Sequence, residues 1–189
     1  MFYRLTSKLL EYPDANLIAA LPELRHELKR GLEAAEWLVL DRFIKYLESI
    51  DLTEAQANYV VTFDLTPEHS LHLTHHLFGD DKNRGPALID LTEFYKEYGL
   101  EMRTTVASAN DEVANDEVAN DEKFNELPDF LPLLLEFSML LETEEARIFL
   151  SQWSKVLNQL ASNLEKAQSP YAPIIRLVEQ RSQLVRAAA

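Results

Sequence analysis

Residues 127–141 are the stretch that most limits how this chain can fold. From residue 130 to residue 141 only Glu136 and Ser138 are polar, so a helix formed here is apolar on nearly every side. Such a helix has no face for solvent and has to be covered by other helices. It is too short to span a bilayer, which takes about 20 apolar residues. The sequence therefore predicts the buried central helix of a helical bundle.

The rest of the chain also favours helices. Apolar residues recur at helical spacing in residues 1–11, 15–29, 32–50, 51–63, 86–98, 143–167 and 170–184. Thr66 and Pro67 are expected to start one more helix. Thr143 is expected to cap the helix over residues 143–167. Only four glycines occur in 189 residues, which is few for a protein of sheets and turns. We predict an all-α fold, a single-domain helical bundle over residues 1–189.

An acidic segment divides this bundle. Residues 109–122 hold nearly three copies of the unit A-N-D-E-V, and a period of five matches neither helix nor strand. Between residues 111 and 126 seven acidic side chains are opposed by one lysine, so this segment carries six of the fourteen net negative charges. It is predicted to be a flexible linker over residues 105–126, with a binding segment as the alternative. N-terminal helices would occupy residues 1–104 and C-terminal helices residues 127–189.

Composition argues against several classes of function. The chain has no cysteine, hence no thiolate metal site or cysteine nucleophile. It has no glycine-rich phosphate loop. A net charge of −14 disfavours nucleic acid and anionic lipid and suits a basic partner, although solubility alone also explains such acidity. The first residues lack the pattern of a signal peptide, so a cytoplasmic location is expected.

No catalytic constellation emerges from the polar residues. Four histidines lie close together in the chain, at His69, His72, His75 and His76. In a helix His72 and His76 would share a face and form a possible metal pair, but Leu73 stands where the H-E-x-x-H motif has its carboxylate. A solvated polar face is the alternative. Glu23 and His26 form one Glu-x-x-His motif, whereas a di-iron bundle needs two. We expect no metal, no cofactor and no enzyme, but a groove for an amphipathic peptide.

Four segments carry patterns that occur together in one known family. Residues 7–14 have the sequence S-K-L-L-E-Y-P-D, and residues 56–64 fit Q-x-x-Y-x-x-x-F-D. Residues 70–79 have the sequence S-L-H-L-T-H-H-L-F-G, with R-G following at 84–85, and residues 127–137 have L-P-D-F-L-P-L-L-L-E-F. In this order they resemble the NarJ family, the delta-chain assembly chaperones of respiratory nitrate reductase. That family lies within the TorD/DmsD superfamily of redox-enzyme maturation proteins.

The resemblance implies a cytoplasmic chaperone without enzymatic activity. Such a chaperone binds the N-terminal segment of the apo catalytic (alpha) subunit of a nitrate reductase. It permits insertion of the molybdenum cofactor before membrane docking and keeps neither metal nor cofactor itself. A sister chaperone that recognises the twin-arginine leader of another molybdoenzyme is the alternative. A metal-dependent enzyme using the histidine cluster is a third hypothesis.

The resemblance also selects candidate peptide-binding residues and shows two departures. The candidates are Tyr59, His76, Arg84, Pro128, Asp129, Phe130 and Glu136. The family has histidine where this chain has Phe130, so a polar contact made through that histidine would be lost. The acidic segment lengthens a hinge that is short in relatives, and a longer hinge permits the C-terminal helices to exchange between protomers. The chain is expected to be a monomer or a domain-swapped dimer.

Overall fold

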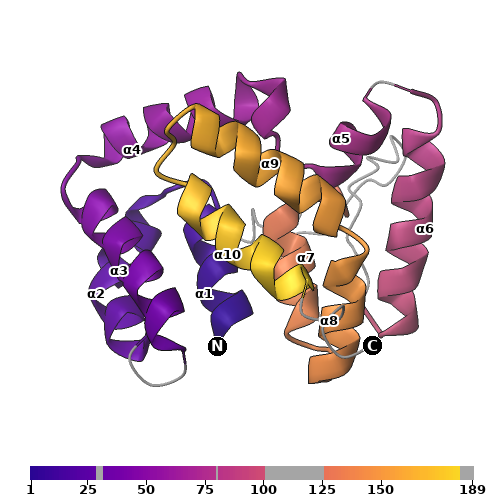
Figure 1. The fold of residues 1–189 in the computed structure, drawn as a ribbon, viewed down its shortest axis with the longest axis horizontal. Helices are drawn as coiled ribbons and strands as arrows, with labels where there is room; N and C mark the ends of the chain where they lie inside the picture. The colour runs from indigo at the N-terminus through magenta and orange to yellow at the C-terminus, as the bar shows by residue number, and fades with distance from the viewer. Residues whose placement is uncertain (29–31, 80, 101–125, 184–189) are drawn as a thin grey trace, which may run out of the picture.

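The computed structural model describes residues 1–28, 32–79, 81–100 and 126–183, and this part of the chain is helical with no named strand. The all-α prediction is confirmed. The α-helices are α1 (Phe2–Leu10), α2 (Ala15–Leu28), α3 (Ala34–Glu48), α4 (Leu52–Tyr59), α5 (Leu73–Phe78), α6 (Arg84–Glu97), α7 (Leu131–Ser138), α8 (Thr143–Ser151), α9 (Ser154–Lys166) and α10 (Ala172–Gln183) (Figure 1). Within these residues no helix has the length and apolar character needed to cross a membrane. The predicted acidic linker lies outside the described residues except for Glu126.

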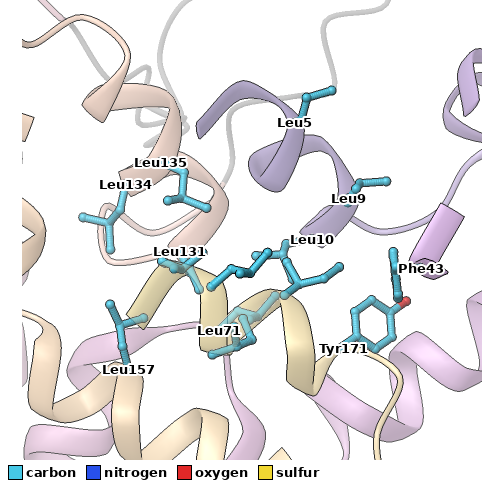
Figure 2. Packing of buried hydrophobic residues seen from close by; sticks show 14 of the residues in the cluster. Leu5, Leu9, Leu10, Phe43, Leu71, Leu131, Leu134, Leu135, Leu157 and Tyr171 are labelled. Carbon is cyan, nitrogen blue, oxygen red and sulfur yellow. The ribbon is translucent and has the colours of Figure 1, made fainter. Parts of the chain in front are cut away.

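One hydrophobic core contains helices from both sides of residues 101–125. Helix α1 packs along α7, α9 packs along α10, and α2 packs along α3. In Figure 1, α2 and α3 lie at one edge and α6 at the other, with α9 and α10 between them. Among the buried side chains labelled in Figure 2, α1 contributes Leu5, Leu9 and Leu10, and α7 contributes Leu131, Leu134 and Leu135. The prediction that α7 is a buried helix is confirmed.

Helix α7 is shorter than the apolar stretch that predicted it. It ends at Ser138, after which Met139 and Leu140 close a tight turn by donating to the carbonyls of residues 136 and 137 at 3.1 and 2.9 Å. Met139 is 43% exposed and Leu140 is 61% exposed, while Leu141 is only partly buried. The expectation of a buried helix up to residue 141 is therefore wrong for its last turn.

The segment with the sequence S-K-L-L-E-Y-P-D attaches α1 to α7. The buried Ser7 hydroxyl donates to the Pro132 carbonyl at 3.0 Å. The Lys8 ammonium lies 3.1 Å from a carboxylate oxygen of Glu136. At the end of the segment, Asp14 accepts a hydrogen bond from the Leu17 amide at 2.6 Å and so caps the start of α2, as a side-chain oxygen at this position is expected to do.

The helix expected from Thr66 onward is interrupted. Only a 3₁₀ turn, η2 (Pro67–His69), forms there, and α5 starts four residues later. His72 precedes α5 with extended dihedral angles, φ −84° and ψ 99°. The Leu73 amide donates to the Asp129 carbonyl at 3.0 Å, and the Leu131 amide donates to the Leu71 carbonyl at 2.9 Å. These bonds to a distant segment replace helical ones, so the expectation that His72 and His76 share a helix face is wrong.

Two further helices deviate from regular α geometry. The helix expected to reach residue 63 stays α-helical only to Tyr59 and continues as a π-helical turn, η1 (Val60–Asp64). The single helix expected over residues 143–167 is divided into α8 and α9, because the amides of Gln152 and Trp153 bond three residues back. Helix α8 is capped by Glu142 in a capping box with Glu145, not by Thr143.

Candidate functional site

The candidate site is built on the pairing of residues 71–73 with residues 129–131. His72 and Phe130 are the directly opposed residues of this antiparallel bridge. Neighbouring residues of an extended segment point to opposite sides. Leu71 and Leu73 are accordingly buried, while the rings of His72 and Phe130 lie on the other side with centroids 5.2 Å apart. The pairing thus places two rings near the surface and directs Asp129 inward.

Asp129 is fully buried, and several donors converge on its carboxylate. Thr74 donates to Oδ2 through its backbone amide at 3.0 Å and through its hydroxyl. His72 Nδ1 lies 3.2 Å from Oδ1. Arg84 Nη2 lies 3.6 Å from Oδ2, and Arg84 Nε donates to the Thr74 hydroxyl at 3.1 Å. A buried charge is tolerated only when it is paired and hydrogen-bonded, and this cluster meets that requirement.

The charge of Asp129 is fixed by these contacts. Burial raises the pKa of the carboxyl, but hydrogen bonds from His72 and Thr74 outweigh it, and the pKa lies below the ordinary aspartate value. The group is therefore a carboxylate at neutral pH, and its lone pairs are used by donors of the protein itself. Asp129 holds His72 and Arg84 in position and has no role as a proton donor.

Two neighbouring contacts hold the same region. The Tyr95 hydroxyl of α6 donates to the carbonyl of the buried Pro128 at 2.8 Å, and burial raises the pKa of this phenol, which keeps it a donor. His76 Nε2 lies 2.8 Å from the Ser70 carbonyl and donates to it. Burial lowers the pKa of His76, so the imidazole is neutral in this contact. Helices α5 and α6 are both fixed to the paired segments in this way.

The chain is similar to known proteins of one family. The family described as nitrate reductase delta subunit matches residues 25–115. A relative from Escherichia coli strain K12, named nitrate reductase molybdenum cofactor assembly chaperone NarJ, is 31% identical over 176 residues, covering 92% of this chain and 66% of the relative. The chain belongs to the nitrate reductase delta subunit family.

Other relatives support the same family. A Bacillus subtilis protein named probable nitrate reductase molybdenum cofactor assembly chaperone NarJ is 29% identical over 175 residues, covering 91% of this chain and 83% of the relative. A Mycobacterium tuberculosis protein named nitrate reductase-like protein NarX is 30% identical over 176 residues, covering 93% of this chain but only 23% of that protein. The chain spans about two thirds of the length of the E. coli relative.

At Phe130, where the family pattern has histidine, the structure shows a histidine on the opposite paired segment. The residue opposite Phe130 in the bridge is His72, and its imidazole contacts the Asp129 carboxylate. An imidazole is therefore present beside this aspartate, although it comes from the other paired segment. The expected loss of a polar group at this point does not leave the site without a histidine.

The sequence indicates His72 only as a possible metal ligand, not as a partner of Asp129 in this site. The alternation L-H-L at residues 71–73, with the polar residue between two apolar ones, is the signal of an extended segment. A helix expected across the same residues concealed this signal. Its partner Asp129 is 57 residues away in the sequence, which is too far for any local pattern to indicate the contact.

The structure brings five of the seven candidate residues together and places two elsewhere. Residues 70–74 contact His76, Arg84, Asp129 and Phe130, and Pro128, next to Asp129, accepts a hydrogen bond from Tyr95. The other two make contacts with the first segment of the chain. Glu136 pairs with Lys8, and Tyr59, which is 4% exposed, donates from its hydroxyl to the Leu10 carbonyl at 3.1 Å.

Replacing Tyr59 by phenylalanine should lower the free energy of unfolding by about 1 kcal/mol, because the buried Leu10 carbonyl loses its donor. The ring stays in its contacts with Tyr12 and Phe63, so the fold should persist. Urea unfolding followed by far-ultraviolet circular dichroism measures the change. Replacing the half-exposed Tyr12 by phenylalanine is the matched control, and an equal loss in both variants would contradict the role given to the hydroxyl of Tyr59.

The histidine cluster does not form a metal site in the part of the chain that the structure describes, where no three His, Cys, Asp or Glu residues are placed to hold an ion. His72 contacts Asp129, and His76 contacts a backbone carbonyl. What the site can do is hold donors and an aromatic ring in fixed positions beside each other. This is the chemistry of recognition.

Proposed function

We propose that this chain is a system-specific assembly chaperone and not an enzyme. Its client is the N-terminal segment of the apo catalytic subunit of a nitrate reductase-like molybdoenzyme. The chaperone acts in the cytoplasm and leaves the molybdenum cofactor to be inserted before the client docks at the membrane. The names of the relatives support this function. The observation that carries it is the buried Asp129, which holds His72 and Arg84 beside Phe130.

The surface around Asp129 suits an amphipathic peptide. Leu127 is 41% exposed and Phe130 is partly exposed, so two apolar side chains three residues apart in the chain are available for contacts. The side chains of His72 and Arg84 are 29% and 24% exposed and can present donors to peptide carbonyls. Acidic residues such as Glu126 would steer a basic segment toward the site and raise its association rate.

Calorimetry with a synthetic peptide of the client's first residues tests this function. The wild-type protein should bind the peptide with a dissociation constant of about 1 μM or below, and His72→Ala should bind it about tenfold more weakly. His75→Ala is the matched control, because His75 is a neighbouring histidine with no contact to Asp129 among the described interactions. Phe130→His should also change the affinity. Absence of binding at tens of micromolar would refute the proposal.

The twin-arginine alternative is tested with the same proteins. A net charge of −14 also favours a basic leader peptide from another molybdoenzyme. Tighter binding of such a leader than of the nitrate reductase segment would assign the chain to that client.

The exchange of C-terminal helices between protomers stays a prediction, since its hinge lies outside the described residues. Light scattering over a range of protein concentrations measures it.

A further inference from the structure

A pocket of about 580 Å³ lies away from the Asp129 cluster, where α3, α4 with η1, η2 and the turn between α9 and α10 meet. Figure 1 shows the start of α10 beneath the end of α9 that lies nearest α4. The polar side chains that line it are Tyr46, Asn58, Thr62, Thr66, His69, Gln168 and Ser169. None of the residues lining this pocket is a carboxylate, an ammonium or a guanidinium. In a chain of net charge −14, such a lining suits an uncharged ligand that both donates and accepts hydrogen bonds.

One residue of this lining has a buried side-chain atom without a hydrogen-bond partner. His69 Nδ1 is buried and finds no hydrogen bond among the described residues. More than nine in ten buried polar groups in folded proteins do have a partner, so an unpaired one needs an explanation, such as strain, a functional role or a bound water or ion. The ring stands on η2, which the Asn163 amide ties to α9 by donating to the Glu68 carbonyl at 3.0 Å. The unpaired nitrogen is therefore held in a fixed place.

The opposite wall of the pocket contains a strained residue. Gln168 has a φ of 54°, and it is the one non-glycine residue with positive φ in the described chain. It ends α9 in a Schellman motif, in which the Ser169 amide donates to the Leu164 carbonyl at 2.9 Å and the Gln168 amide donates to the Glu165 carbonyl at 3.0 Å. Glycine is the usual residue at this position, because it adopts positive φ without strain. Folding alone would favour glycine here.

A third unfavourable feature forms another side of the pocket. Val61 and Thr62 belong to the π-helical turn η1. Such turns are rare in proteins, and those that occur are often found at functional sites. Val61 is 58% exposed, and Leu65, which follows η1, is 69% exposed. A π turn, a strained glutamine and an unpaired imidazole thus surround one uncharged pocket with exposed apolar side chains close by. Locally unfavourable features of this kind cluster at active sites and ligand-binding sites.

We propose that this pocket binds an uncharged, extended stretch of the client peptide, beyond the part held beside Asp129. The inference rests on the proposed chaperone function. Peptide amides both donate and accept hydrogen bonds, as the neutral lining requires, and apolar client side chains would pack on Val61 and Leu65. His69 and His72 are three residues apart, so their Cα atoms lie within about 11 Å of each other. One client segment can reach both sites, and the second contact would strengthen binding without a second molecule.

Gln168→Gly separates this role from folding. Glycine relieves the positive φ, so the variant should be at least as stable as the wild type while it loses the amide in the pocket. Two peptides are used in calorimetry, the first ~6 and the first ~40 residues of a nitrate reductase catalytic subunit, because about six residues can fill the Asp129 cluster but leave too little extended chain, at about 3.5 Å per residue, to cover the pocket about 11 Å away as well. The wild type should bind the longer peptide about tenfold more tightly. Gln168→Gly should lose this advantage and keep its affinity for the short peptide.

Two further variants complete the test. Thr62→Val removes another lining hydroxyl and should reduce the advantage of the longer peptide, whereas Gln180→Ala, on the exposed side of α10, should leave it unchanged. If the wild type shows no such advantage, or Gln168→Gly keeps it, the pocket proposal is overturned. The proposed function then still stands, provided that the short peptide binds and His72→Ala weakens it. If neither peptide binds, both proposals fail.

Discussion

Replacing Phe137 by alanine is expected to lower the free energy of unfolding by about 4 kcal/mol, because a buried aromatic ring is lost and a cavity remains. Phe137 is 2% exposed at the end of α7. Its ring lies with centroid distances between 4.7 and 5.5 Å from those of Phe94, Tyr95, Tyr98 and Phe149. Aromatic pairs at such distances add stability beyond the area they bury.

The same substitution should loosen α6. Tyr95 is the one fully buried residue of this helix, and its ring rests on Phe137. Because Arg84 is the first residue of α6, the Asp129 cluster should weaken together with the core. Urea unfolding and hydrogen exchange of α6 amides measure the two effects. Ile148→Ala, at a site 54% exposed, should change stability by less than about 0.5 kcal/mol. A loss below about 1 kcal/mol in Phe137→Ala would contradict the packing described here.

Much of the fold follows from local patterns in the sequence. Helix α7 is predicted by having no polar face, and Asp14 and Asp51 accept the amides of Leu17 and Glu54, as aspartate before the first turn of a helix commonly does. The points where predicted helices are interrupted do not follow from local patterns. The extended conformation of His72 depends on hydrogen bonds to residues 129–131, which no local pattern contains. The helical periodicity of residues 143–167 likewise continues through the point where α8 ends and α9 starts.

In the site too, local motifs identify some of the residues, whereas the contacts between them depend on segments far apart in the sequence. The motifs identify Asp129 and Arg84, and the structure brings them together with Thr74 between them. They also select Tyr59 and Glu136, whose contacts with residues 8–12 show that a motif residue can hold the fold instead of lining a surface. Which residue faces Phe130 depends on the register of the pairing. A shift of one residue would place Leu71 or Leu73 there.

Asp129→Ala should lower the free energy of unfolding by about 3 kcal/mol, because it leaves the buried Thr74 amide without an acceptor and removes the partner of His72 and Arg84. In the folded state the pKa of Asp129 lies below its ordinary value. The stabilisation by this carboxylate is therefore complete above the ordinary pKa of about 4 and is lost as the pH falls through the lowered folded-state pKa. The difference in the free energy of unfolding between the wild type and Asp129→Ala should therefore become smaller at acidic pH.

Glu126→Ala is the matched control for this variant, since it also removes a carboxylate beside His72. The Glu126 side chain is 53% exposed, and its oxygen lies 3.8 Å from His72 Nε2. An exposed ion pair at this distance contributes little, so the free energy of unfolding should change by less than about 0.5 kcal/mol. Urea unfolding at neutral and acidic pH distinguishes the two carboxylates. Equal losses in the two variants, or a difference that stays constant as the pH falls, would mean that the carboxylate of Asp129 does not hold the paired segments together. His72 would then need another anchor beside Phe130.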